Sequence, residues 1–594
     1  MAVTNLLTLM EDGEGTLGTL TSIGGGAGAG AETEIFFAGS QSIGRRSDNQ
    51  TSLHGFFINV GATFNLSGAG QHVKIWSWFT HYKAVTGVQY RLGSSTTAYE
   101  AFTYPTTKIP ALGGWFPAWL EVNAGTDTGT PDFTVIDEIA QAITIGDVAG
   151  NTNNNIMDQV HHGTSGMRWD GTGGGLSDFR TTEASNALGV FLSRDGIDYL
   201  FARLEIGSST STTFTATGYT IVFPDQPLCS TTFMGLTFDL QHASTAISMT
   251  GGTVTSGDPA SAARRGDLIV TGTAGTLTLN NNKLAGLRLL TLNSKVTANN
   301  CVFSNTGQIT ANGADLVGSA VSGYEGSANT SAVVWDVNTD PDGFLDDMTF
   351  TKGTAATHAI ELGTTSPTTV TLRGITFSGY NAADGQNDSV VHVKRTSGAV
   401  TIFAVACSGT MSYRSDGADV TVVSDPVTIS VHVNDNAGAN LENARVFLKA
   451  TGGSGPFPAD ESVTITRSGS TATVSHTGHG MATNDKVVIA GADQLEYNGI
   501  FTITFIDANS YSYTVSGTPA TPATGTITST FVALHGLTNA SGDISASRVY
   551  SADQAVVGWV RKQSGTPYFR TSTLGGAVDS ALGYTATVQM VLDQ

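Results

Sequence analysis

The chain has 594 residues, of which 13% are charged, and 49 acidic against 28 basic side chains give a net charge of −21. This acidic balance argues against nucleic acid or an anionic membrane as a main partner. The three cysteines form no CxxC pair, which argues against a zinc site or a disulfide framework. The sequence has 72 glycines and is rich in Ser, Thr and Val, a composition that favours turns and strands. We therefore expect an all-β fold without a cofactor and without a segment inserted in a membrane.

The first part of the chain predicts an arm followed by a β-sandwich. Residues 1–30 end in a Gly/Ala run, which has too little apolar surface to offset its loss of backbone entropy. We expect this arm to become ordered only against a partner. Residues 31–228 hold many short runs of strand formers and are expected to form a jelly-roll-like sandwich, with one short helix at residues 135–143. His161 and His162 follow a Gly/Asn-rich stretch, and we expect both to be exposed.

Residues 229–424 return repeatedly to one motif, a small or polar residue followed by strand formers and then Ser, Thr or Asn. The central residues of five successive copies are 303, 321, 350, 377 and 407, which lie 18, 29, 27 and 30 residues apart. Units this short cannot bury an apolar face alone and must stack on their neighbours. Because helical periodicity is almost absent, the stack predicts a right-handed parallel β-helix with loops of variable length.

The pattern changes after residue 425. Residues 427–433 alternate between apolar and polar, a polar turn follows at residues 434–438, and an L-x-x-A-x-V run begins at Leu441. This order resembles the small Ig-like modules related to the carboxypeptidase regulatory domain. The resemblance implies an Ig-like β-sandwich built from residues 425–460 together with residues 529–594.

Residues 461–528 separate the two halves of that module and contain four motifs in a fixed order: H-G, D-x-V-x-I-x-G, N-G-x-F-x-I and D-x-N-x-Y-x-Y-x-V. The order resembles the first catalytic-cysteine half-domain of ubiquitin-activating enzymes, a module that also recurs in phage virion proteins. We expect a small all-β insertion in a hairpin loop of the Ig-like module, displayed as a contact surface. Tyr497, Tyr511 and Tyr513 are its candidate binding residues, although the alternation of Tyr511 and Tyr513 on one strand face also fits core positions.

The densest acidic cluster lies between two copies of the β-helix motif. Its alternating oxygen donors, which resemble the start of a calcium loop, are Asp336, Asn338, Asp340 and Asp342. The twelfth position from Asn338 is Thr349, where a calcium loop carries Glu. We therefore favour a plain corner loop rich in turn formers over a metal site.

The same cluster is the best candidate for glycan cleavage, because paired carboxylates act as acid and as base or nucleophile in glycoside hydrolysis. The catalytic candidates are Asp340, Asp342, Asp346 and Asp347, with Glu361, Asp384 and Asp388 as further carboxylates. Carboxylates on solvated corners are common without catalysis, so an enzyme is the less favoured interpretation. His476 and His479 have no third metal ligand nearby in the sequence.

The order of these domain types resembles bacteriophage virion appendages, namely tail fibres, tailspikes and head-attached fibres. The resemblance implies a structural virion protein that attaches to the host surface, commonly as a homotrimer. Its partners would be other virion proteins and a host glycan or protein. The N-terminus lacks the basic region of a secretory signal, which favours assembly in the host cytoplasm. The alternatives are a tailspike depolymerase, acting as a glycoside hydrolase or polysaccharide lyase, and a secreted bacterial adhesin.

Overall fold

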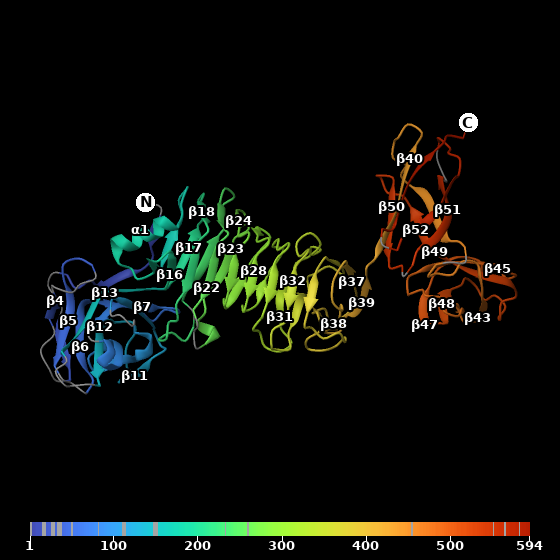
Figure 1. Ribbon diagram of the computed structural model, residues 1–594. Coiled ribbons are helices and arrows are strands. Elements are labelled where there is room, and N and C mark those ends of the chain that lie inside the picture. The colour runs from blue at the N-terminus through green and yellow to red at the C-terminus, as the bar shows by residue number, and fades with distance from the viewer. Residues whose placement is uncertain are drawn as a thin grey trace. The chain divides into compact units, whose positions relative to one another are not determined.

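The computed structural model confirms an all-β protein, with 52% of residues in strands and 4% in helices. It describes residues 3–14, 19–24, 30–32, 38–48, 52–80, 82–109, 114–146, 152–231, 233–257, 261–452, 455–550, 552–562, 566–580 and 582–593. Two compact units divide the chain, residues 1–400 with 407–421, and residues 401–406 with 422–594 (Figure 1). No helix in these ranges is long and apolar enough to cross a membrane.

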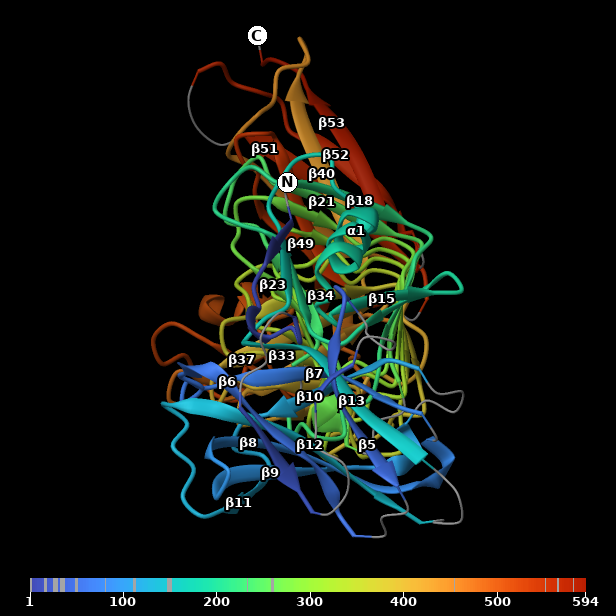
Figure 2. The same cartoon turned by 90° about the vertical axis from the view of Figure 1, so that its left-hand side faces the viewer.

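The first unit begins with two antiparallel sheets of six strands each (Figure 2). One contains β2 (Thr8–Glu11), β4 (Gly30–Glu32), β5 (Ser42–Asp48), β7 (His72–Phe79), β10 (Phe116–Glu121) and β13 (Thr152–Gly163). The other contains β3 (Leu20–Ile23), β6 (His54–Phe64), β8 (Val85–Ser95), β9 (Ala98–Tyr104), β11 (Thr126–Thr128) and β12 (Ile136–Ile145). Ile75 and Met157 from the first sheet and Tyr90 and Ile139 from the second share one buried core. The short helices among the described residues are α1 (Leu176–Asn186), η1 (Tyr82–Ala84), η2 (Thr106–Lys108), η3 (Ala262–Arg264) and η4 (Leu495–Tyr497).

Three local expectations for this region are wrong. Residues 136–145 form the central strand β12, not a helix, because β6 and β8 pair with its two edges. His161 is buried on β13, opposite Lys74 of β7. The N-terminal segment is not a free arm, since β1 (Val3–Asn5) pairs with β14, β2 with β13 and β3 with β6. The Gly/Ala run between Gly24 and Gly30 lies outside the described residues.

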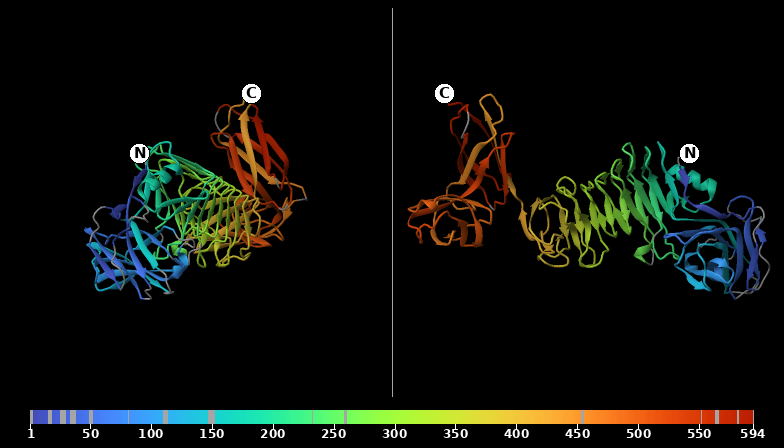
Figure 3. Two further views of the ribbon diagram at one scale, coloured as in Figure 1. Left: turned by 60° about the vertical axis from the view of Figure 1, so that its left-hand side comes forward. Right: turned by 180° about the vertical axis from the view of Figure 1, so that it is seen from behind.

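A parallel stack follows in the same unit, built from three sheets (Figure 3). The first is β14 (Met167–Trp169), β17 (Arg203–Gly207), β20 (Gly235–Asp239), β23 (Asp267–Thr271), β26 (Leu289–Thr291), β29 (Ile309–Thr310), β31 (Ser331–Trp335), β33 (His358–Leu362), β36 (Val391–Val393) and β38 (Tyr413–Ser415). The second is β15 (Phe191–Arg194), β16 (Ile197–Leu200), β19 (Thr220–Phe223), β22 (Thr253–Ser256), β25 (Lys283–Ala285), β28 (Val302–Ser304), β30 (Ala320–Ser322), β32 (Thr349–Thr351) and β35 (Thr376–Ser378). The third is β18 (Thr213–Thr217), β21 (Ala246–Thr250), β24 (Thr276–Thr278) and β27 (Val296–Thr297). From β17 to β28 the chain visits the three sheets in turn, which is the connectivity of a parallel β-helix.

Inward side chains of successive coils lie directly above one another. On the second sheet they are Val254, Leu284, Phe303, Val321, Phe350 and Phe377. All six are buried, and the rings of Phe350 and Phe377 stack with centroids 5.7 Å apart. The stack begins earlier than residue 229, because β14 already pairs in parallel with β17, and β16 with β19. The early strands β14, β16, β17 and β19 do not end in Ser, Thr or Asn, so the sequence pattern favours sandwich strands there.

The second unit joins the Ig-like halves and the segment between them. A three-stranded sheet contains β40 (Val427–Asp435), β50 (Asp543–Arg548) and β53 (Tyr584–Met590). A seven-stranded sheet contains β41 (Ala444–Ala450), β42 (Glu461–Ser462), β45 (Lys486–Ala492), β46 (Gly499–Thr502), β49 (Gly525–Leu537), β51 (Gln554–Lys562) and β52 (Ser572–Val578). A four-stranded sheet contains β43 (Thr464–Ser468), β44 (Thr471–Ser475), β47 (Thr504–Asp507) and β48 (Ser510–Thr514). The remaining described strands are β34 (Thr369–Arg373), β37 (Ala399–Val405) and β39 (Asp419–Ser424), which form a three-stranded sheet.

The long strand β49 ties residues 461–528 to the flanking sandwich. Its first part pairs with β45, and its second part pairs with β41, which precedes the segment in the chain. The chain thus leaves the sandwich after β41 and returns beside it. One continuous core holds side chains of all three pieces, such as Val431, Ile489 and Val560. The segment is therefore not a separate tethered module, because it shares a sheet and a core with its neighbours.

Candidate functional site

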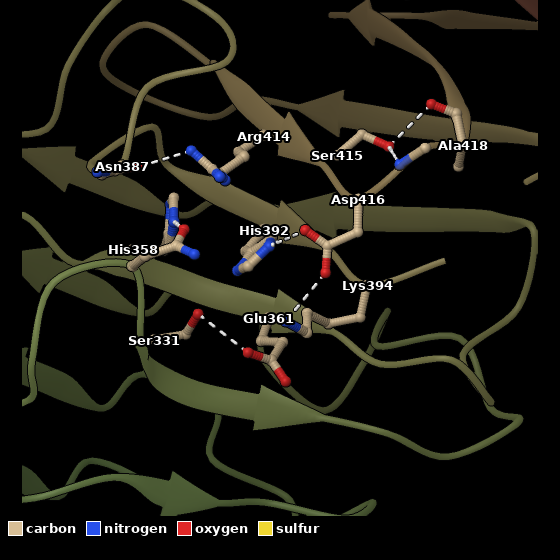
Figure 4. A network of polar contacts seen from close by, with 12 residues as sticks. Ser331, His358, Glu361, Asn387, His392, Lys394, Arg414, Ser415, Asp416 and Ala418 are labelled. Atoms are coloured by element: carbon tan, nitrogen blue, oxygen red, sulfur yellow. Dashed lines mark hydrogen bonds and ion pairs between the residues drawn. The ribbon is translucent and has the colours of Figure 1, made fainter. Parts of the chain in front are cut away.

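Titratable side chains gather on one face of the first parallel sheet, over β33, β36 and β38 (Figure 4). Strand pairing places Glu361 beside His392, and His392 beside Arg414. Neighbouring strands are about 4.8 Å apart, so these three side chains succeed one another along the stack. Glu361 lies between Ile360 and Leu362, which are buried, and alternation directs it to the opposite face. We call Glu361, His392 and Arg414, with Lys394 and Asp416 beside them, the polar row.

Asp416 is the acceptor that joins two members of the polar row. His392 Nε2–H donates to Asp416 Oδ1 over 2.9 Å, and Lys394 Nζ lies 3.0 Å from Asp416 Oδ2. The hydrogen bond from His392 is the largest cause that lowers the pKa of the Asp416 carboxyl. The His392 side chain is fully buried, and its Nδ1 has no partner among the residues that the structure describes.

His358 packs against His392 of the row. Its ring centroid lies 4.7 Å from that of His392. His358 Nδ1–H donates to the Ser389 carbonyl over 2.6 Å, and Nε2 lies 3.1 Å from the Asn329 side-chain oxygen. Burial lowers the pKa of His358 to about 4, and the nearby charges of His392 and Arg414 act in the same direction. His358 is therefore neutral at pH 7.

The two ends of the row have uncharged partners. Ser331 Oγ lies 3.5 Å from Glu361 Oε2, and the Arg414 guanidinium donates to the Asn387 side-chain oxygen. Arg414 Nε is buried without a partner in the described part of the chain. Carboxylate acceptors and guanidinium or ammonium donors thus lie together on a rigid sheet. This arrangement can hydrogen-bond the hydroxyl groups of an extended polar ligand.

The acidic cluster singled out from the sequence serves mainly to join coils. Asp336 Oδ1 accepts hydrogen bonds from the backbone and the hydroxyl of Thr365, at 2.8 and 2.6 Å. Asp340 Oδ1 accepts from the Thr371 backbone over 2.8 Å. Each partner lies about one coil further along the chain.

Two other carboxylates of that cluster lie near one cation. Asp342 forms an ion pair with Arg373 over 2.9 Å, and Arg373 also lies 4.0 Å from Asp346. Burial raises the pKa of Asp346. Asp347 and Asn338 are exposed. Within the described ranges, no three His, Cys, Asp or Glu side chains lie together as a metal site would require. Asp340, Asp342, Asp346 and Asp347 therefore form no calcium centre with the other described carboxylates.

Of the further carboxylate candidates, only Glu361 joins the polar row. Asp384 Oδ1 accepts from the Tyr413 backbone over 2.9 Å, and Asp388 forms an ion pair with Lys352 over 2.7 Å. His392, Lys394, Arg414 and Asp416 were missed in the sequence. These four residues lie on coils whose loops differ in length, so they do not recur at a fixed spacing in the sequence. The one available signal is the V-H-V strand at β36, where a polar residue interrupts an apolar run.

The three tyrosines expected at a contact surface are core residues. Tyr497 and Tyr511 are fully buried, and Tyr513 is 3% exposed. Their hydroxyls donate to Ala520 O over 3.0 Å from Tyr497 and to Tyr497 O over 3.1 Å from Tyr513, while Tyr511 pairs with the Ser529 hydroxyl over 2.7 Å. The structure therefore corrects the binding role proposed for them. Their burial follows from the core that residues 461–528 share with the sandwich.

Comparisons with known proteins found no matching family model and no matching curated protein. Among solved structures, the chain is similar to an exo-β-agarase at 12% identity and a TM-score of 0.20, over 26% of this chain and 24% of the agarase. It is similar to the catalytic unit of an α-1,3-glucanase from Streptomyces thermodiastaticus at 11% identity and a TM-score of 0.18, over 71% of this chain and 97% of the glucanase. A tailspike of Acinetobacter baumannii bacteriophage AP22, solved with capsular saccharide, matches at 10% identity and a TM-score of 0.18, over 87% of this chain and 84% of the tailspike.

Proposed function

We propose that the chain is a structural protein of a tailed-bacteriophage virion, a fibre or spike subunit that contacts host-surface glycan through the accessible side chains of the polar row, namely Glu361, Lys394, Arg414 and Asp416. The observation that carries the proposal is the in-register succession of Glu361, His392 and Arg414. Glycans present closely spaced hydroxyl groups, each able to donate and accept hydrogen bonds. Planar carboxylate and guanidinium groups bind such groups well when their backbone is rigid.

The parallel stack suits the structural part of this role. Ten parallel strands from β14 to β38 make nine spacings of about 4.8 Å, or roughly 43 Å of regular sheet. We propose that three copies associate into the fibre and that other virion proteins hold one end. The mass of the purified protein in solution checks this part, and a monomer at every concentration would contradict it.

The glycan proposal is tested by binding of the full-length protein to immobilised bacterial capsular polysaccharides and lipopolysaccharides. We expect Glu361→Gln and Arg414→Gln each to weaken binding about tenfold, the loss of one charge-assisted hydrogen bond. The matched control is Arg194→Gln, since Arg194 is 76% exposed and lies at the end of β15, which belongs to a different sheet from the row. Equal binding by all four proteins would contradict a role for the polar row.

One observation favours a depolymerase as the second candidate. Glu361 and Asp416 are two carboxylates on either side of the coil that carries His392, which is the register partner of Glu361 and donates a hydrogen bond to Asp416. Paired carboxylates are the groups that glycoside hydrolysis requires. A reducing-end assay on any polysaccharide that binds decides between the two candidates. If the wild type releases oligosaccharide and both Glu361→Gln and Asp416→Asn do not, the chain is a depolymerase and not only an attachment protein.

A further inference from the structure

Strand β50 lies at the edge of its sheet in the second unit, and no described strand pairs with its outer side. Each residue from Asp543 to Arg548 pairs with β40, and no other described strand pairs with β50. Ser545, Ala546 and Ser547 are exposed, and the strand contains no proline. Proteins commonly block such edges with Pro, bulges or inward charges, because a free edge accepts another strand.

Local hydrogen bonds show which backbone groups point to the open side. The Gly542 carbonyl accepts from Val433 of β40 over 2.8 Å, so residue 542 faces β40. The Asp543 N–H instead donates to the Asn539 side-chain oxygen, and the Asp543 carbonyl accepts from the Asn539 N–H. In an antiparallel ladder, residues whose backbone N–H and carbonyl groups point to the partner strand alternate with residues whose groups point away from it. The N–H and carbonyl groups of Ser545 and Ser547 therefore point away from β40.

The end of β49 forms the opposite wall. β45 pairs with β49 only as far as Val532, so no described strand continues along residues 533–537 on that side. Lys486 Nζ donates to the His535 carbonyl over 3.1 Å, which shows that this carbonyl faces the open side. A cleft of about 290 Å³ lies between the two walls and is lined by residues of β45, β49 and β50.

The rim of the cleft is cationic although the chain as a whole carries a net charge of −21. Lys486 and Arg548 line the cleft, and Arg445 lies beside it, with its guanidinium 3.3 Å from His535 Nε2. Asp485 is the one acidic residue of the lining and is paired with Arg548 over 2.7 Å. The Arg548 guanidinium also lies over the Phe457 ring, 4.4 Å from its centroid. This surface fits a ligand with carboxylates.

We propose that this cleft binds an extended acidic peptide segment of a partner protein. The segment adds as a strand to β50, pairs with the outward groups of Ser545 and Ser547, and directs carboxylates to Lys486 and Arg548. Strand addition supplies affinity through main-chain hydrogen bonds, and the cations supply selectivity. The inference is independent of the glycan proposal, because the two sites lie in different units.

The test uses the full-length protein and a fluorescein-labelled synthetic peptide of alternating Thr and Glu, followed by anisotropy. We expect saturable binding that Lys486→Gln weakens about tenfold, since one charge-assisted contact is lost. A peptide of alternating Thr and Lys should not bind. Arg570→Gln is the matched control, because Arg570 is 65% exposed and does not line the cleft.

A second probe separates strand addition from simple charge attraction without changing the protein. A Thr/Glu peptide N-methylated at alternate residues keeps its charge but loses the donors of one edge. We expect its binding to fail when the methylated edge is the one that faces β50. Hydrogen exchange at the amides of Ser545 and Ser547 should slow when the unmethylated peptide is bound. Equal binding by both peptides, or unchanged exchange at these amides, would overturn the proposal.

Discussion

His358 shows how the stack fixes a protonation state. The side chain is fully buried, and its two nitrogens contact Ser389 and Asn329. Its pKa falls from an ordinary 6.5 to about 4, mainly because burial disfavours the charged ring. At pH values between about 4 and 6.5, His358 is mostly protonated in the unfolded chain and mostly neutral in the folded protein. Stability is therefore fully present above pH 6.5 and is lost as the pH falls toward 4.

We expect His358→Gln to flatten this pH dependence. Urea denaturation of the first unit, followed at pH 7.5 and pH 4.5, should show the wild type losing about 2 kcal/mol more than the variant between the two values. His242→Gln, in the loop between β20 and β21, is the control and should keep the wild-type slope. The same slope in all three proteins would mean that His358 does not carry the effect.

At the scale of elements, in-register inward side chains hold the coils together. Phe350 is fully buried between Val321 and Phe377 of neighbouring coils, while Val302 on the outward side of the same sheet is 42% exposed. Coils of this size have no core of their own, so each depends on its neighbours.

We predict that Phe350→Ala destabilises the first unit by about 3–5 kcal/mol, because a large side chain is removed from a closely packed site. Val302→Ala should change stability by no more than about 1 kcal/mol. Chemical denaturation followed by tryptophan fluorescence measures both. A small effect of Phe350→Ala would show that the neighbouring coils close around the cavity.

At the scale of the molecule, β49 makes one folding unit of residues 422–594. The strand pairs with β45 and with β41, and one core joins both parts. We therefore expect residues 422–594 expressed alone to unfold in one cooperative transition.

Replacing residues 454–528 by a short Gly/Ser linker tests the shared core. The deletion removes β42 to β48 and the buried Tyr497, Tyr511 and Tyr513. We expect the shortened protein to lose its cooperative thermal transition, as measured by calorimetry. A cooperative transition near the wild-type temperature would mean that the outer strands form a sandwich without the segment between them.

The sequence by itself determined the all-β class, the stacked coils and the strands of the second unit, because alternation and turn residues are local signals. It also brought Glu361 forward as a carboxylate of interest. Only the tertiary structure decided which coils lie beside which. Glu361, His392 and Arg414 meet because strands pair in register across loops of unequal length, and no local pattern records that register. The same reason places Tyr511 in a core and the N-terminal strands in sheets, since burial and edge pairing depend on residues far away in the chain.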